Sequence, residues 1–180
     1  MKTKKNILAI IGSASKNSSN LKLVQKIAEL TKNDLHINIF DSLSTLPHFD
    51  PGLSIANTPG IIVDFRNAIQ EADGIIISTP EYIFSIPAGL KNAIEWCVST
   101  TVFSKKPTGI ITASASGIKA HEELKLIMRT VETSFNEETT LLINGVKGKI
   151  HAGGNITDEK THVALKAFSE AFTQLVHDNS

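Results

Sequence analysis

The sequence predicts an α/β protein built on an open, doubly wound parallel sheet. Short apolar runs alternate along the chain with longer stretches in which apolar residues recur at helical spacing. The short runs place Ile and Leu at consecutive positions, which is typical of strands that helices cover on both faces. Five such strands alternating with five helices indicate right-handed β–α–β crossovers within a single sheet.

Each predicted strand is an apolar run of six residues. The five runs are 6–11 (NILAII), 35–40 (LHINIF), 74–79 (GIIIST), 108–113 (TGIITA) and 139–144 (TTLLIN). The predicted helices lie at about 19–32, 59–72, 88–102, 119–133 and 158–176. In the fourth helix the apolar residues recur at i, i+3, i+4 and i+7, which places them on one stripe: Leu124, Ile127, Met128 and Val131.

Two segments fall outside this alternation. Residues 41–60 are predicted to form a long surface loop, and long loops in compact domains are often functional or face a partner. Residues 144–155 are rich in glycine and are predicted to continue the fifth strand irregularly. Since no repeat or linker divides the chain, residues 1–180 are predicted to form one domain.

The composition argues against several classes of partner. Lys and Arg together number 18, as do Asp and Glu, so no net field attracts nucleic acid or an anionic membrane. No stretch approaches the roughly 20 apolar residues of a membrane span. The single cysteine, Cys97, cannot form an internal disulfide, and no CxxC or HExxH pattern predicts a metal site. We therefore expect a cytoplasmic protein that binds no nucleic acid, membrane or metal.

The segment after the first strand suits an anionic ligand. Ligands of open α/β sheets bind beyond the carboxyl ends of the strands, and here GSASKNSSN (12–20) places hydroxyl groups where a helix begins. The partial positive charge and free N–H groups of a helix N-terminus favour a phosphate. The segment matches neither GxGxxG nor the P-loop, and a polar turn with Ser18 or Ser19 as the N-cap explains the same residues.

The segment after the third strand suits a flat ligand. Pro80 and Pro87 stiffen it, while Tyr82 and Phe84 offer ring surface beside backbone amides. Such surfaces line sites for planar heteroaromatic molecules. A hydrophobic loop packed on a partner subunit would have the same composition, and the two roles are compatible.

Together these two segments resemble the NADPH-dependent FMN reductase family, flavodoxin-like proteins that include quinone, azo-dye and chromate reductases. The family's first motif reads about GSxRxxSxN and is matched at Gly12, Ser13, Ser18 and Asn20. Its second reads about PEYNxSxPGxLKNAx[DE]W. The matching residues there are Pro80, Glu81, Tyr82, Ser85, Pro87, Leu90, Lys91, Asn92, Ala93, Glu95 and Trp96. The second match is the longer and more specific one.

The resemblance implies a flavodoxin-like sheet with strand order 2-1-3-4-5 and FMN bound across three loops. By this resemblance the phosphate would be held by Ser13, Ser18 and Asn20, and the hydroxyl groups of the same loop add Ser15 and Ser19 as expected phosphate contacts. The isoalloxazine ring would contact residues of the second and third loops: Pro80, Glu81, Tyr82, Ile83, Ser85, Ser114, Ser116 and Gly117. Because the cofactor carries the chemistry, no side chain is predicted to be catalytic.

The implied activity is that of an FMN-dependent NAD(P)H oxidoreductase. NADPH or NADH would give a hydride to the bound flavin, which would pass electrons to a small-molecule acceptor such as a flavin or a quinone. The family also implies a homodimer or homotetramer, with residues 41–60 and the helix ending at Trp96 as the contact surface.

Departures from the family motifs support an alternative function. Ser15 stands where the family has arginine, Ile83 where it has asparagine, and Phe84 where it has a small residue. The first change removes a charge-assisted phosphate contact, which would be stronger than a neutral one. The alternative is a flavodoxin-like protein with weak or lost FMN binding that acts through a protein partner.

Three other side chains have both a chemical and a structural interpretation. Cys97 is predicted to be buried and inert, because no neighbouring histidine or helix N-terminus activates its thiol. His121 either approaches the flavin edge or substrate, or is exposed or caps a helix. Glu81 resembles a general base, but a lone loop carboxylate more often makes a structural pair.

Overall fold

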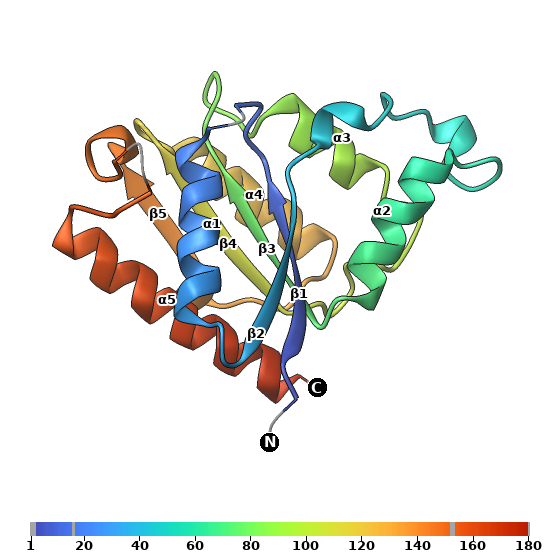
Figure 1. Cartoon of the computed structure of the whole chain (residues 1–180). Helices are drawn as coiled ribbons and strands as arrows, with labels where there is room; N and C mark the ends of the chain where they lie inside the picture. The colour runs from blue at the N-terminus through green and yellow to red at the C-terminus, as the bar shows by residue number, and fades with distance from the viewer. Residues whose placement is uncertain (1–2, 16, 152–153, 180) are drawn as a thin grey trace.

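The core of the molecule is a five-stranded parallel sheet in the order β2-β1-β3-β4-β5 (Figure 1). A computed structural model of the chain describes residues 3–15, 17–151 and 154–179. The strands are β1 (Lys5–Ile11), β2 (Leu35–Phe40), β3 (Gly74–Thr79), β4 (Thr108–Ser114) and β5 (Thr140–Asn144). Their bounds agree with the predicted ones to within one residue, and the expected flavodoxin-like fold and strand order are confirmed.

Helices cover both faces of the sheet, as the apolar runs predicted. The helices α1 (Ser19–Leu30) and α5 (Glu159–Asp178) cover one face, and α2 (Gly60–Glu71), α3 (Ala88–Glu95) and α4 (Ile118–Thr130) cover the other (Figure 1). In β3, Ile75 and Ile77 belong to the core under α2, α3 and α4, whereas Ile76 belongs to the core under α1 and α5. Since successive side chains of a strand point to opposite faces, both faces need apolar residues and the run is continuous.

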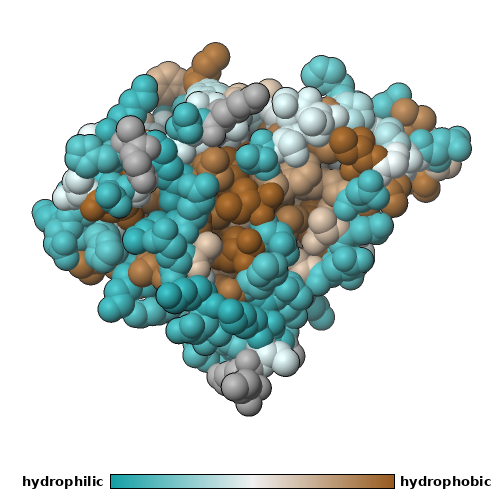
Figure 2. All heavy atoms as spheres, in the orientation of Figure 1, coloured by the Kyte–Doolittle hydropathy of each residue, from teal (hydrophilic) through white to brown (hydrophobic). Residues whose placement is uncertain are grey.

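The edge strand β2 is less completely covered than the centre of the sheet. Every residue of β3 is buried, whereas Ile39 of β2 is 37% exposed. In Figure 2, which has the orientation of Figure 1, apolar atoms are exposed in the middle of the view, between the regions of α1 and α2. Among the helices that the structure describes, none has the length and apolar content required to cross a bilayer.

The predicted helix at 88–102 is too long, because α3 ends at Glu95. Beyond Glu95 the backbone includes hydrogen bonds between residues three apart, such as Cys97 N–H to Ile94 O (2.9 Å) and Thr100 N–H to Cys97 O (3.0 Å). The sequence VSTTV at 98–102 explains the end of the helix. Its β-branched and hydroxyl side chains have low helix propensity, and the Thr100 hydroxyl also bonds to the Cys97 carbonyl at 2.7 Å.

The predicted long loop at 41–60 contains two short 3₁₀ turns, Leu43–Thr45 and Pro51–Leu53, and is held against α3. The Pro47 carbonyl accepts hydrogen bonds from Trp96 Nε1 (2.8 Å) and Asn92 Nδ2 (2.9 Å). Asn92 Oδ1 in turn accepts the Phe49 N–H at 2.7 Å. These bonds fix the loop to the helix that follows the Tyr82 segment.

Candidate functional site

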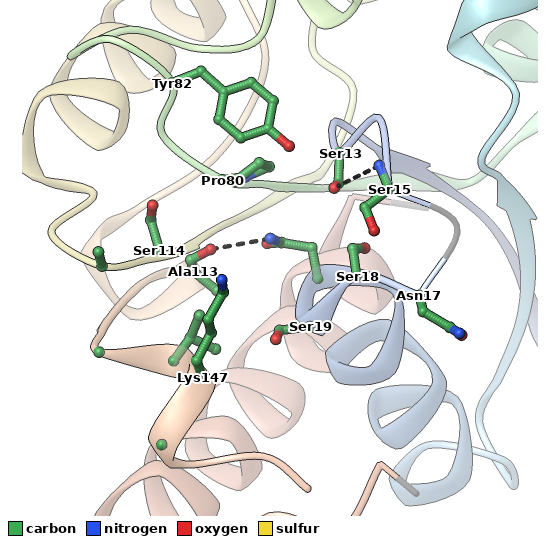
Figure 3. Close-up of a pocket in the computed structure, with 15 residues that line it drawn as sticks. Ser13, Ser15, Asn17, Ser18, Ser19, Pro80, Tyr82, Ala113, Ser114 and Lys147 are labelled. Atoms are coloured by element: carbon green, nitrogen blue, oxygen red, sulfur yellow. Dashed lines mark hydrogen bonds between the residues drawn. The ribbon is translucent and has the colours of Figure 1, made fainter. Parts of the chain in front are cut away.

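A pocket of about 710 Å³ opens at the carboxyl ends of β1, β3, β4 and β5 (Figure 3). It lies at the sheet edge where open α/β proteins bind ligands. Eight of the thirteen predicted site residues line it: Ser13, Ser15, Ser18, Ser19, Asn20, Pro80, Tyr82 and Ser114. The other five, Glu81, Ile83, Ser85, Ser116 and Gly117, lie outside its lining.

The turn that leaves β1 depends on a close approach to β3. The Gly12 N–H donates to the Ser78 carbonyl at 2.8 Å. A Cβ built on Gly12 would overlap Thr79 Oγ1 and would lie 2.7 Å from Thr79 Cβ. Glycine is therefore required here by the neighbouring strand, and it turns the following serines into the pocket.

The serines of this loop combine a structural role with free donor capacity. Ser18 is the N-cap of α1, and its Oγ accepts the Leu21 N–H at 3.1 Å, which confirms the N-cap interpretation for this residue. Ser13 Oγ accepts the Ser15 N–H at 3.2 Å. In both cases the hydroxyl hydrogen remains able to donate into the pocket, beside a helix N-terminus whose partial charge favours an anion.

Asn20 forms part of the pocket wall and joins three elements. Its Nδ2 donates to the Ala113 carbonyl of β4 at 3.0 Å, and its Oδ1 accepts from Ser78 Oγ of β3 at 3.0 Å. The side chain is 3% exposed. Both polar atoms of the amide therefore have protein partners, so that Asn20 holds the start of α1 against the sheet. The predicted phosphate contact of Asn20 stays a prediction.

A tight hairpin forms the tip of the loop after β3. Tyr82 and Ser85 exchange two backbone hydrogen bonds, of 2.9 and 3.1 Å. The two residues between them, Ile83 and Phe84, have φ values of 51° and 57°, which is a type I′ turn. Ile83 is 95% exposed and Phe84 is 77% exposed, and the tip projects from the molecule (Figures 1 and 2). The turn thus directs Tyr82 to the pocket and its neighbours to solvent.

Two carboxylates connect this loop to α4. Glu81 Oε1 accepts the Gly117 N–H (3.2 Å) and Oε2 accepts the Ala120 N–H (3.0 Å), at the positive end of the α4 dipole. Glu123 Oε2 accepts from Ser85 Oγ (2.7 Å) and from the Ile86 N–H (3.0 Å). The structural interpretation of Glu81 is thus the one that the geometry supports. Ser116 is exposed, and Gly117, with φ of 85°, is the N-cap of α4.

Replacing Glu81 with alanine is expected to lower the free energy of unfolding by about 1–3 kcal/mol, because two N–H groups lose their acceptor. The affinity for a ligand in the pocket should also fall, since Pro80 and Tyr82 lose their attachment to α4. Urea unfolding and ligand titration measure the two effects.

Glu122→Ala is the matched control for this change. Glu122 lies on the same helix and pairs with Lys119 at 2.9 Å, with 62% of each side chain exposed. Exposed pairs contribute at most about 1 kcal/mol, so this variant should unfold almost as the wild type does. Equal stability of Glu81→Ala and Glu122→Ala would contradict the bridging role of Glu81.

The turn after β5 is a part of the site that the sequence analysis missed. Gly145, Val146, Lys147 and Gly148 line the pocket, the last three as a 3₁₀ turn. The segment was predicted only to continue the strand irregularly. The signal was nevertheless present, because a glycine-rich segment at the carboxyl end of a strand beside β4 must reach the same sheet edge.

The remaining candidates lie outside the pocket lining. His121 Nδ1 is 3.0 Å from Thr112 Oγ1, and burial, with the nearby Lys125, lowers the pKa of the imidazole. Cys97 is buried, as expected, and burial raises the pKa of its thiol to about 12. Within the described ranges, no group of three His, Cys, Asp or Glu side chains is placed to hold a metal ion.

Comparison with known proteins gives matches over nearly the whole chain. A family model described as NADPH-dependent FMN reductase matches residues 5–147. The 2-hydroxy-1,4-benzoquinone reductase of Burkholderia sp is 29% identical, with 96% of each chain covered. The NADPH:quinone oxidoreductase of Arabidopsis thaliana is 32% identical, with 89% of this chain and 86% of that one covered.

A solved structure with the same fold is FerB, a flavoenzyme NAD(P)H:(acceptor) oxidoreductase from Paracoccus denitrificans. It superposes with a TM-score of 0.82 at 28% identity, and the match covers 97% of this chain and 98% of FerB. These matches confirm the resemblance seen in the two loop motifs, together with FMN as cofactor and a nicotinamide nucleotide as electron donor. This chain belongs to the NADPH-dependent FMN reductase family and is an oxidoreductase.

Proposed function

We propose that this protein binds FMN in the pocket at the sheet edge and transfers electrons from NADPH or NADH to a quinone, a flavin or a similar small acceptor. The observation that carries the proposal is the composition of the pocket. Hydroxyl groups and the N-terminus of α1 lie at one end, and Pro80 and Tyr82 lie at the other (Figure 3). FMN, when bound, would supply the redox chemistry, because a flavin can accept a hydride and pass the two electrons on.

The residues present fit a molecule of this kind. A volume of about 710 Å³ lies within the range of small-molecule and cofactor sites. Ser13 and Ser18 would hold the phosphate through their hydroxyl groups, aided by the helix N-terminus. Pro80 and Tyr82 would flank the ring, and Ser114 would lie on its other side. The Burkholderia and Arabidopsis relatives, a benzoquinone reductase and a quinone oxidoreductase, support a quinone as the acceptor.

In this function the protein would hold the loop after β3 in place beside the flavin ring and leave the ring accessible to substrates. Two contacts keep the loop after β3 in place: Glu81 accepts from the N-terminus of α4, and Glu123 of α4 accepts from Ser85 and the Ile86 N–H. Tyr82 is 43% exposed, so this wall of the pocket borders solvent. A nicotinamide and then an acceptor would reach the ring from that side.

The proposal includes a cytoplasmic location and assembly as a homodimer or homotetramer. Exposed apolar side chains on the surface predicted for subunit contact support this assembly: Leu53, Ile55 and Val98. Ile55 is 86% exposed and belongs to the 41–60 loop, while Val98 follows α3. Apolar groups gathered on a surface favour association.

The test of the function is flavin binding followed by turnover. Protein stripped of ligand is titrated with FMN, and the loaded protein is then mixed with NADPH or NADH and a panel of quinones, flavins and azo dyes. A yellow complex that oxidises the nicotinamide supports the proposal. A colourless protein whose spectrum FMN does not change would overturn it in favour of the alternative that acts through a protein partner.

Tyr82 and Phe84 are expected to have separable roles, because only Tyr82 lines the pocket. Tyr82→Ala should weaken FMN binding about tenfold through the loss of an aromatic wall. Phe84→Ala should leave the dissociation constant for FMN nearly unchanged and reduce subunit association. Fluorescence titration and light scattering measure the two quantities. If neither variant changed either quantity, both the flavin and the subunit roles of this hairpin would be wrong.

A further inference from the structure

We infer that Lys147, in the turn after β5, is the cation that pairs with the phosphate of the ligand; the inference rests on the proposed function. Within the described part of the chain, Lys147 is the only charged residue that lines the pocket. The described residues of the first loop contribute only neutral groups. A phosphate held by hydroxyl groups alone would forgo the stronger charge-assisted contacts, and one lysine in the wall supplies them.

The turn places Lys147 on the phosphate side of the pocket. Val146 packs in the core beneath α1 and α5, together with Leu23 and Val24 of α1. Ile86, which follows the Tyr82 hairpin, packs in the opposite core, beneath α3 and α4. The turn that carries Lys147 is therefore anchored on the face of the sheet that α1 covers. The loop with Pro80 and Tyr82, which would flank the flavin ring, is anchored on the other face.

The backbone of the turn is well fixed. Gly145 has φ of 62°, and its N–H donates to the Ala115 carbonyl at 3.0 Å, which joins the turn to the loop after β4. The N–H groups of Gly148 and Lys149 close the 3₁₀ turn at 3.1 and 3.0 Å. Val146 is 5% exposed and anchors the centre of the turn. The long lysine side chain thus extends from a rigid base, and only its own torsions need ordering.

The ammonium group of Lys147 points into the pocket and is available to a ligand. Figure 3 shows Lys147 pointing toward Ala113 and the centre of the pocket. Among the residues that the structure places, its side chain has neither an ion-pair nor a hydrogen-bond partner. An exposed, unpaired lysine beside a helix N-terminus adds a full charge to the partial charge of the helix, and both favour a phosphate dianion.

The test compares FMN with riboflavin, which lacks the phosphate, by titrating ligand-free protein and following flavin fluorescence. Lys147→Met is expected to weaken FMN binding about tenfold and to leave riboflavin binding unchanged, because only FMN loses a charge-assisted contact. Lys147→Arg should restore FMN binding to within about threefold, since guanidinium also binds phosphate. The preference for FMN should weaken with salt in the wild type, and less so in Lys147→Met.

Two controls remove the same charge elsewhere. Lys149→Met changes a neighbouring lysine outside the pocket lining and should leave FMN binding unchanged. Lys16→Met changes a lysine of the first loop that lies outside the described residues. An unchanged FMN-to-riboflavin ratio in Lys147→Met, an equal loss for both flavins, or a loss in Lys16→Met alone would overturn the assignment of Lys147. Failure of the wild type to bind either flavin would instead overturn the proposed function.

Discussion

Replacing Gly12 with alanine is expected to lower the free energy of unfolding by about 2–3 kcal/mol, the upper part of the range for overpacked sites, and to remove most FMN binding. The added Cβ would overlap Thr79 Oγ1 and would lie 3.0 Å from Leu90 Cδ2. Thr79 and Leu90 are both fully buried, so neither can move into solvent. The turn after β1 must shift instead, and it carries the serines of the phosphate end. Urea unfolding and FMN titration measure the two losses.

Gly60→Ala is the matched control for this substitution. Gly60 is the first residue of α2, and a Cβ added there would meet no atom within 4 Å. The same change should therefore be neutral or stabilising by about 0.5–1 kcal/mol, because alanine favours the helix. A Gly12→Ala protein that unfolds at the same urea concentration as the wild type would show that the β1–β3 approach tolerates a side chain.

The double substitution of Ile83 by Asn and Phe84 by Gly is expected to raise the free energy of unfolding by about 1–2 kcal/mol, since a left-handed backbone is strained for side chains of the L configuration. The pair Asn-Gly is the preferred sequence of a type I′ turn. Because Ile83 and Phe84 are 95% and 77% exposed, little packing is lost. FMN binding should persist, since neither residue lines the pocket. Thermal and urea unfolding at low protein concentration measure the gain.

Ile55→Asn separates strain relief from the removal of an exposed apolar group. Ile55 is 86% exposed and has no left-handed backbone, so its replacement should change stability by less than about 0.5 kcal/mol. Loss of stability in the double variant would mean that the hairpin tip makes stabilising contacts, and light scattering of the same samples would show whether a second subunit supplies them.

The fold could be predicted from the sequence because strands that are buried on both faces appear as runs of consecutive apolar residues. In β3 every position is buried, so its centre is a run of consecutive isoleucines, and the predicted strand and the observed one coincide at Gly74–Thr79. The end of α3 was predicted too late, since helical spacing of apolar residues continues past Glu95. There the local preference of Val98 and Thr100 for non-helical backbone outweighs the pattern.

The site could be predicted where it depends on chain order and not where it depends on tertiary contacts. Ser13 and Tyr82 follow strand ends, and the topology places both at the pocket. The capping of α4 by Glu81 needs two loops that are separated by more than thirty residues in the chain. The sequence did not predict the hairpin at Ile83 for another reason. A type I′ turn favours residues such as Asn and Gly at its two central positions, and Ile and Phe stand there instead. Rules of local sequence fail at strained positions of this kind.

The attachment of the 41–60 loop to α3 gives the protein an internal optical probe. Trp96 is the only tryptophan of the chain, and its side chain is fully buried. Its indole N–H donates to the Pro47 carbonyl at 2.8 Å, and its ring meets Phe49 edge-on with centroids 5.3 Å apart. Intrinsic emission therefore reports release of this loop from the helix, as water reaches the indole, and can be followed alongside the flavin signal.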